Sequence, residues 1–551
     1  MNFGESLDNS SIMKRFSVLL IFILVAVSAV AQTDTNAVAV PPDTNAPAPQ
    51  PDTNGVAVYA DTNTTTMPTN RMAAATTHPM SLEDCIQEAL QHNFDMQISR
   101  YTPQIQLFNV RADYGGYDPT FSFSGQDQHN DTGGEFINGL PRPAQTSDQG
   151  IFNSGLTGLL PWGLTYNFSG NVNNTHNVSF ENFTNTATQN SSGSAGVSLT
   201  QPLLKNFWID STRLTIKLAK NQLASDEQGL RLQIITSVTA VENAYYELIF
   251  AQENLQVQQE ALNLAQTQLD QDRQRVQIGT LSPLDVQQDE AQVATSRANL
   301  ITAQYTLAQD QNTLKNLLAD TNYATWHDTD IQPTDTITNA PLQLFDLQDS
   351  WSKGMTQRPD LIQSRLNVEA QGIQLKFDRN QLFPEVDLIG SYGYNGAGVY
   401  YDDVFAQINS RDRNFYSYGA QLSMPLSLQN PRNTYKSDKV TLQQLLLKLK
   451  QFEQNVMVDI DNAVKNAQST YESVGATRQA RIYAEAALDA EQKKYAVGKS
   501  TTFTVLQLQN TLTTDRGQEI RALANYYEAL ATLAQKEGST LDRLHINVEV
   551  K

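Results

Sequence analysis

The sequence is poor in cysteine, in basic residues and in histidine clusters, and each shortage excludes a class of protein. Cys85 is the only cysteine, which excludes an internal disulfide and a cysteine-based zinc site. Lysine and arginine number 38 against 58 acidic residues, so we do not expect nucleic acid as a partner. The six histidines are scattered without metal-ligand spacing, and no catalytic constellation is present. We therefore expect neither an enzyme nor a bound cofactor or metal.

Long hydrophobic runs are also scarce, and the one clear example lies at the N-terminus. A basic pair at 14–15, an apolar stretch over 16–30 and small residues at 29–31 predict a secretory signal peptide over 1–31, with Met13 as the start. No second run approaches the roughly 18 residues that a membrane-spanning helix needs. If the mature protein enters a membrane, we expect it to do so as strands.

The segment that follows the signal peptide is low in complexity. Over residues 32–79 the triplet Asp-Thr-Asn recurs four times among proline, alanine and valine. Few aromatic residues and no helical period predict a flexible linker. At the other end of the chain, residues 539–551 are expected to form a C-terminal tail.

The rest of the chain is an internal duplication. Residues 81–100 align with residues 346–365 at an offset of 265, and both segments read as helices. We therefore predict a first structural repeat over 80–345 and a second over 346–538.

Each repeat continues with alternating residues that predict strands. One side of the alternation is aromatic or apolar, as in Val386, Leu388 and Tyr392, and the other is small and mostly polar. This pattern suits strands between lipid and a wet lumen, although a soluble half-buried sheet alternates in the same way. The expected strands lie at about 120–128, 153–160, 164–171 and 195–201 in the first repeat, and at about 385–394 and 415–425 in the second.

Each repeat ends in a pattern that predicts a long helical hairpin. In the first, Leu262 and Leu269 belong to a seven-residue repeat typical of coiled coils, and the chain turns at Gly279. In the second, residues 432–497 lack proline and can form a helix of about 65 residues, which turns at Gly498. A hairpin this long cannot bury itself and needs partners along its whole length.

Together these features resemble the TolC family of outer-membrane efflux proteins, over about residues 81–538. The resemblance rests on RPDL at 358–361, LFP at 382–384, the prolines at 202 and 425, and the turn sequences VQIGTLSPLDV and YAVGKSTTFTV. It implies a mainly α fold with β structure, in which coiled-coil hairpins of a homotrimer form a periplasmic α-barrel continued by a transmembrane β-barrel.

The resemblance also implies a function. The trimer would sit in outer-membrane lipid, with a periplasmic extension, as the exit duct for small-molecule efflux or type I secretion. Its partners would be a periplasmic adaptor protein and, indirectly, an inner-membrane pump. A periplasmic coiled-coil scaffold and an outer-membrane tether without transport remain as alternatives.

The candidate functional residues follow from the same resemblance. The hairpin tips would dock the adaptor, although their glycines can equally serve only to end helices. A hydrogen bond between Tyr495 and Asp285 would help to close the channel, although Asp285 can instead cap its own helix and Tyr495 can be packing. The family's ring of aspartates is replaced here by Thr504 and Gln507. The tip residues are Ile278, Gly279, Thr280, Leu281, Ser282, Pro283, Val497, Gly498, Lys499, Ser500, Thr501 and Thr502.

One feature departs from the family, the extra strand pair at 153–171. Family members usually contribute four strands each to a twelve-stranded barrel, whereas six per protomer would make eighteen. Alternatively, the extra hairpin folds outside the barrel or into it.

Overall fold

The computed structural model describes residues 76–137, 139–142, 144–181, 184–318, 329–337, 340–341 and 345–546. The chain divides into two units, Met1–Arg71 and Met72–Lys551, and every described residue belongs to the second. The expected signal peptide and nearly all of the expected linker therefore lie outside the described residues. Within the described ranges, no helix is both long enough and apolar enough to cross a membrane.

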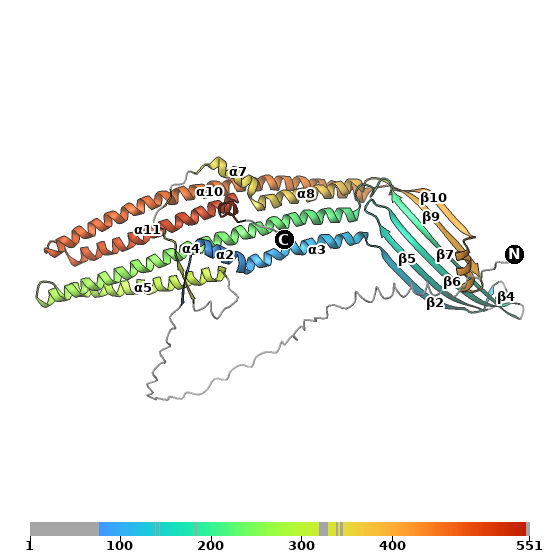
Figure 1. Cartoon of the computed structure of the whole chain (residues 1–551), viewed down its shortest axis with the longest axis horizontal. Helices are drawn as coiled ribbons and strands as arrows, with labels where there is room; N and C mark the ends of the chain where they lie inside the picture. Colours follow the sequence, from blue (N-terminus) through green and yellow to red (C-terminus); the bar gives the residue numbers. More distant parts are fainter. Residues whose placement is uncertain are drawn as a thin grey trace, which may run out of the picture. The chain divides into compact units, whose positions relative to one another are not determined.

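Two long antiparallel helical hairpins form the helical part of this unit (Figure 1). The first consists of α4 (Ser211–Gln277) and α5 (Pro283–Leu318), and the second of α10 (Gln429–Ala496) and α11 (Thr502–Glu537). Their helices have 67 and 36 residues in the first repeat and 68 and 36 in the second. The two halves of the duplication therefore fold alike. Helix α11 also packs against α4, which joins the two hairpins.

In each repeat, two shorter helices precede the strands of the sheet. These are α2 (Leu82–His92) and α3 (Phe94–Asp113) in the first repeat, and α7 (Leu347–Gln357) and α8 (Pro359–Asn380) in the second. Pro359 is the first residue of α8, a position where a helix does not need the missing N–H. Helices α3 and α8 are the last α-helices before the sheet strands of their repeats.

Six antiparallel strands form one sheet in the order β10-β9-β7-β6-β5-β2 (Figure 1). The two repeats meet where β7 pairs with β9. The hairpin of β5 and β6, which contains the extra strand pair expected at 153–171, lies inside this sheet, and β2 and β10 are its edges. The strands are β2 (Thr120–Thr132), β5 (Gln145–Leu159), β6 (Thr165–Glu181), β7 (Thr184–Pro202), β9 (Glu385–Gly398) and β10 (Asn414–Ser423).

The two faces of the sheet differ sharply in chemistry. Strand register aligns one row of apolar or aromatic residues across all six strands, and the next row, on the opposite face, consists of serine, threonine and asparagine. We call these the apolar face and the polar face. The first row is Phe121, Leu156, Phe168, Val197, Tyr392 and Tyr416, and the second is Thr120, Thr157, Asn167, Ser198, Ser391 and Ser417.

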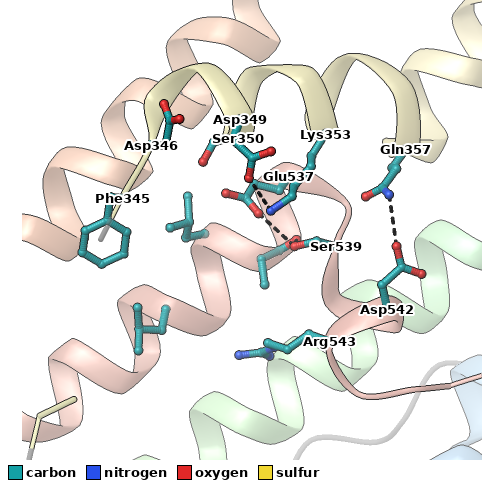
Figure 2. Close-up of a pocket in the computed structure, with 13 residues that line it drawn as sticks. Phe345, Asp346, Asp349, Ser350, Lys353, Gln357, Glu537, Ser539, Asp542 and Arg543 are labelled. Carbon is teal, nitrogen blue, oxygen red and sulfur yellow. Dashed lines mark hydrogen bonds and ion pairs between the residues drawn. The ribbon is translucent and has the colours of Figure 1, made fainter. Parts of the chain in front are cut away.

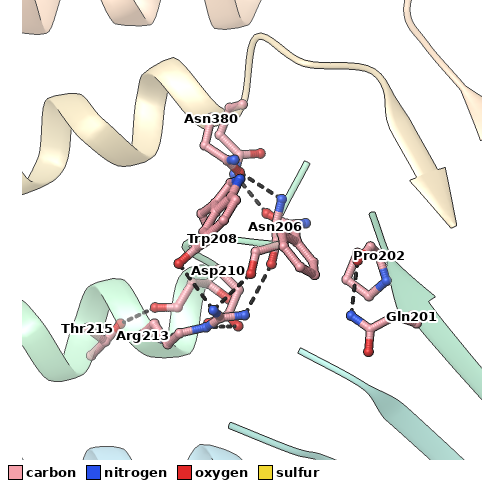
Figure 3. Close-up of polar contacts among 11 residues, drawn as sticks. Gln201, Pro202, Asn206, Trp208, Asp210, Arg213, Thr215 and Asn380 are labelled. Carbon is pink, nitrogen blue, oxygen red and sulfur yellow. Dashed lines mark hydrogen bonds and ion pairs between the residues drawn. The ribbon is translucent and has the colours of Figure 1, made fainter. Parts of the chain in front are cut away.

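A network around Arg213 fixes the passage from β7 into α4 (Figure 3). Asp210 caps α4 by accepting the backbone N–H of Arg213 at 2.7 Å, and its other oxygen accepts from Nε of Arg213 at 2.8 Å. The same guanidinium donates to the carbonyls of Phe207 and Trp208 at 2.9 and 3.1 Å. Asn380, at the end of α8, accepts the N–H of Asn206 at 2.7 Å, so both repeats hold this corner.

The largest core lies where α2, α4, α5 and α11 meet. A short strand beside this core shows that the linker ends earlier than expected. Strand β1 (Thr76–Met80) pairs in parallel with β8 (Thr329–Pro333) beside this core, so ordered structure begins before residue 79. Met80 and Ile331 are buried there, and Tyr245 donates to the carboxylate of Asp335 at 2.8 Å. Strands this short carry too little alternation to be recognised from sequence.

Five further elements were not expected from the sequence. They are a 3-10 helix (Tyr114–Tyr117), β3 (Glu135–Ile137), β4 (Leu140–Arg142), α9 (Tyr401–Ser410) and α12 (Thr540–Arg543). Helix α12 lies within the segment that the sequence assigns to the C-terminal tail, and Arg543 at its end contacts α4 through Glu242.

Candidate functional site: the hairpin tips

Both hairpins turn through the same local structure. Gly279 and Gly498 take φ values of +79° and +73°, in the left-handed region that favours glycine. In each tip the residue after the glycine donates its N–H to a carbonyl five residues earlier, from Thr280 to Arg275 and from Lys499 to Lys494, both at 2.9 Å. A Cβ atom at either glycine would meet nothing within 4 Å. Within one protomer, backbone conformation alone therefore requires these glycines.

Apolar side chains are exposed at both tips. Ile278 and Val497, which precede the glycines, are 74% and 67% exposed. Leu284 and Phe503, each the second residue of a returning helix, are 62% and 64% exposed. Both pairs lie 219 residues apart in the chain, so the duplication repeats this surface. Leu284 and Phe503 were not identified from the sequence. The signal that could have indicated them is a single apolar residue at the equivalent position of each polar tip.

The expected tip residues do not all share one environment. Leu281 and Ser500 are half-buried, and Ser500 donates to Glu491 at 2.5 Å. Thr502 is buried beneath the second tip. The exposed members are Ile278, Gly279, Thr280, Ser282, Pro283, Val497, Gly498, Lys499 and Thr501.

Behind the tips, a buried polar cluster joins the two hairpins. The phenol of Tyr495 on α10 donates to the carboxylate of Asp272 on α4, with both oxygens at 2.8 Å, and lies 2.9 Å from the hydroxyl of Thr502. Asp272 is fully buried and also accepts from Gln268 at 2.7 Å. The guanidinium of Arg275 lies 3.6 Å from the Asp272 carboxylate and 4.5 Å from the centre of the Tyr495 ring. This cluster ties the end of α10 to the first hairpin.

The hydrogen bond expected between Tyr495 and Asp285 is wrong for this structure. Asp285 accepts the backbone N–H of Ser282 at 3.3 Å, so it caps the start of α5. A carboxylate in the first turn of a helix is stabilised by the unpaired N–H groups and by the helix dipole. Asp272 takes its place as the partner of the phenol because it faces α10 from within the interface.

A second carboxyl group completes the cluster. Asp289 on α5 is 1% exposed, and neither of its oxygens has a hydrogen-bond donor among the described residues. Burial and the neighbouring Asp272 carboxylate raise the pKa of Asp289 to about 7. Below about pH 7, Asp289 is therefore expected to carry a proton, which it can share with the neighbouring Asp272 carboxylate. We therefore expect the contact between α4 and α5 to respond to pH.

The positions of Asp272 and Asp289 carry a sequence signal that was overlooked. They follow Leu269 and Val286 by three residues, within stripes where a coiled coil ordinarily places apolar residues. An acid in such a stripe needs a partner when it is buried. Gln292 and Asn510 provide a further link between the hairpins, exchanging two side-chain hydrogen bonds of 2.7 and 3.0 Å.

A separate cavity of about 400 Å³ lies between α7, the end of α11 and α12 (Figure 2). Its charged lining is already paired. Lys353 contacts Asp349 at 2.6 Å, Gln357 donates to Asp542 at 3.1 Å, and Glu537 accepts from Ser539 at 2.9 Å. Pairing of this kind fits a structural junction that anchors the C-terminal segment. The hairpin tips therefore remain the stronger candidate for the functional site.

Comparisons with known proteins agree with this architecture. A family model described as "Outer membrane efflux protein" matches residues 159–320 and 352–539, one match in each repeat. "Outer membrane protein TolC" of Vibrio cholerae is 23% identical over 365 residues, covering 65% of this chain and 80% of that protein. The protein of the same name from Escherichia coli is 26% identical over 339 residues, covering 57% and 63%.

A solved structure supports the fold over a larger part of the chain. The Campylobacter jejuni CmeC outer membrane channel aligns with a TM-score of 0.60, covering 83% of this chain and 86% of that one. The sequence identity is 13%, so this likeness concerns the fold.

Proposed function

The chain belongs to the outer membrane efflux protein family, and from that premise we propose that it is the exit duct of an efflux or type I secretion system. Members of this family are efflux channels of the outer membrane. The finer proposal is a homotrimer whose hairpins extend into the periplasm, where they dock to an adaptor protein that connects them to an inner-membrane pump.

The observation that carries this proposal is the open sheet with its two unlike faces. Strands β2 and β10 are the free edges of the sheet, and such edges must be paired within a membrane. Pairing β2 of one protomer with β10 of the next would close a barrel, with the apolar face toward lipid and the polar face toward the lumen. Six strands per protomer would make a barrel of eighteen in a trimer.

Conductance in planar bilayers tests the channel directly. Purified trimers should produce discrete conductance steps, whereas a tether or scaffold would produce none. Fractionation supplies the second measurement, because the protein should sediment with the outer membrane as a detergent-resistant trimer. A monomer in the soluble periplasmic fraction would refute the proposal.

For adaptor docking, the exposed residues Ile278, Leu284, Val497 and Phe503 are the proposed contacts. Phe503→Asp should reduce efflux and adaptor crosslinking while trimer yield stays unchanged. Gly498→Asn separates two explanations for the tip glycine, because asparagine tolerates positive φ but adds a side chain. Normal efflux in Gly498→Asn would mean that the glycine serves only to turn the chain. Gly475→Ala, on the open side of α10, is the matched control.

For the gate, we propose that Tyr495 and Asp272 hold the second hairpin against the first in the closed channel. Tyr495→Phe removes the phenol that donates to a buried carboxylate, and should therefore raise closed-state conductance. Asp285→Asn, which alters only the cap of α5, should leave it unchanged. The opposite ranking of these two variants would restore the gate role to Asp285.

A further inference from the structure

The connection between β9 and β10 contains a helix that lies across the apolar face. Strand β9 begins beside the end of α8, so its connection to β10 lies at the opposite end of the sheet from the long helices (Figure 1). There, α9 packs against β9, β7 and β6. Val404, in the middle of α9, is completely buried by this contact.

Four glycines on the apolar face make room for α9. A Cβ atom on Gly193 would lie 2.9 Å from a methyl carbon of Val404, and one on Gly150 would lie 2.5 Å from the hydroxyl of Tyr401. On Gly396 and Gly398 it would collide with the carbonyl of Val404 and the side chain of Asp403. These glycines come from three strands of two repeats. We call them the glycine cradle.

Polar contacts fix the helix on the cradle. Gln407 accepts the N–H of Ala397 at 3.1 Å, and Ser191 donates to the carbonyl of Val399 at 3.0 Å. Asp403 accepts the N–H groups of Val399 and Tyr400, both at 3.1 Å, which caps the start of α9. The helix is therefore held in place from its N-terminus and along its length.

The side of α9 that faces away from the sheet mixes apolar and polar residues. Phe405 is 56% exposed and Tyr400, just before the helix, is 62% exposed. Asp402 and Asn409 flank Phe405 on the same exposed side. Aromatic residues beside polar ones suit the headgroup region of a membrane, whereas carboxylates exclude the hydrocarbon core.

We propose that α9 is an interfacial helix that places Phe405 and Tyr400 among the lipid headgroups of the outer leaflet. This inference rests on the proposed function, since a channel in the outer membrane turns the apolar face toward lipid. The end of the sheet opposite the periplasmic helices then reaches the outer leaflet. The glycine cradle keeps α9 close to the barrel wall, so that the helix forms a shelf at the membrane surface.

Spin labels on the trimer in lipid bilayers test this placement. Cys85, the only cysteine, is fully buried, so a label added under native conditions attaches at an introduced cysteine. The three labelled variants are Phe405→Cys on α9, Tyr418→Cys on the apolar face and Ser417→Cys on the polar face. Relaxation is measured with oxygen, which dissolves in hydrocarbon, with a soluble nickel chelate, and with nickel bound to a headgroup-chelating lipid.

The label at 405 should respond most strongly to the nickel lipid, the label at 418 to oxygen and the label at 417 to the soluble chelate. Gly396→Val should abolish the nickel-lipid response at 405 by displacing α9, because the three atoms nearest to a Cβ atom on that glycine all belong to Val404. Gly390→Val is the matched control, because a Cβ atom on that glycine of the same face meets nothing within 4 Å.

Two other outcomes are decisive in different ways. If the label at 405 responds like the one at 417 while the label at 418 still responds to oxygen, α9 lies in water beyond the headgroups, and the inference fails while the channel stands. If the label at 418 also responds only to the soluble chelate, the apolar face does not meet lipid, and the proposed function fails with the inference.

Discussion

Replacing Asp289 by asparagine should remove the pH dependence of the contact behind the tips. Folding raises the pKa of Asp289 from 3.8 to about 7, first through burial and then through Asp272. A group whose pKa rises on folding contributes stability that is complete below its unfolded pKa and is lost as the pH rises through its folded pKa. The shift of about three units corresponds to at most about 4 kcal/mol at 1.36 kcal/mol per unit. Local opening admits water to Asp289, so the measured loss of stability should stay below that limit.

Hydrogen exchange of the backbone amides around Gly498 measures this effect. After correction for intrinsic rates, protection in the unaltered trimer should fall as the pH rises from about 3.8 to about 7, by up to about a thousandfold for 4 kcal/mol. Asp289→Asn should keep its protection across the same range, because an amide stays neutral and still donates to Asp272. Asp285→Asn is the control and should retain most of the pH dependence, because Asp285 is the weakest of the groups that raise the pKa of Asp289. A flat profile in the unaltered protein, or an undiminished slope in Asp289→Asn, would refute the reasoning.

Three further substitutions test the packing of the helices. Burial raises the pKa of Glu528 to about 7, so its stabilising contribution is lost as the pH rises through that value. Glu528→Gln should therefore raise the melting temperature at about pH 8 but not at about pH 5, and equal shifts would contradict this account. Tyr245→Phe removes the bond to Asp335 and should cost about 1.5–3 kcal/mol in denaturant unfolding, whereas no loss would mean that water replaces the phenol. Arg543→Met leaves Glu242, which is 1% exposed, without its cation, and should cost about 3 kcal/mol near neutral pH and less in acid, where Glu242 is protonated.

The parts of the fold that follow local rules could be predicted from the sequence. The long hairpins follow from the seven-residue repeat, and the turns at Gly279 and Gly498 follow from the need for positive φ. The alternation along the strands places Tyr392 and Ser391 on opposite faces, as the register confirms. Each of these features depends on residues that are close together in the chain.

The features that were missed depend on residues that are far apart. Helix α9 has a short polar sequence, and its position depends on glycines in strands of both repeats. The partner of Tyr495 could not be identified from the tip sequence, because Asp272 lies 223 residues away on another hairpin. Resemblance to the family indicated Asp285 instead, and that carboxylate turned out to cap its own helix.

The carboxyl pair behind the tips belongs to a wider pattern in the helical part. Among the described residues, three acidic side chains have buried oxygens without a donor, namely Asp289, Glu528 and Asp378. Each faces a carboxyl group on another helix, and burial is the first cause that raises each pKa, to about 7, about 7 and about 6. The partners are Asp272, Glu247 and Asp438.

These three pairs lie between different helices, α4 with α5, α4 with α11, and α8 with α10. A proton supplies the missing donor in every pair, whereas its loss leaves two carboxylates in contact. Distant sites contribute nearly additively, so one change in pH acts in the same direction at all three contacts. Mild acid is therefore expected to strengthen these three contacts together, including the contact of Asp289 with Asp272 beside the Tyr495–Asp272 link at the tips.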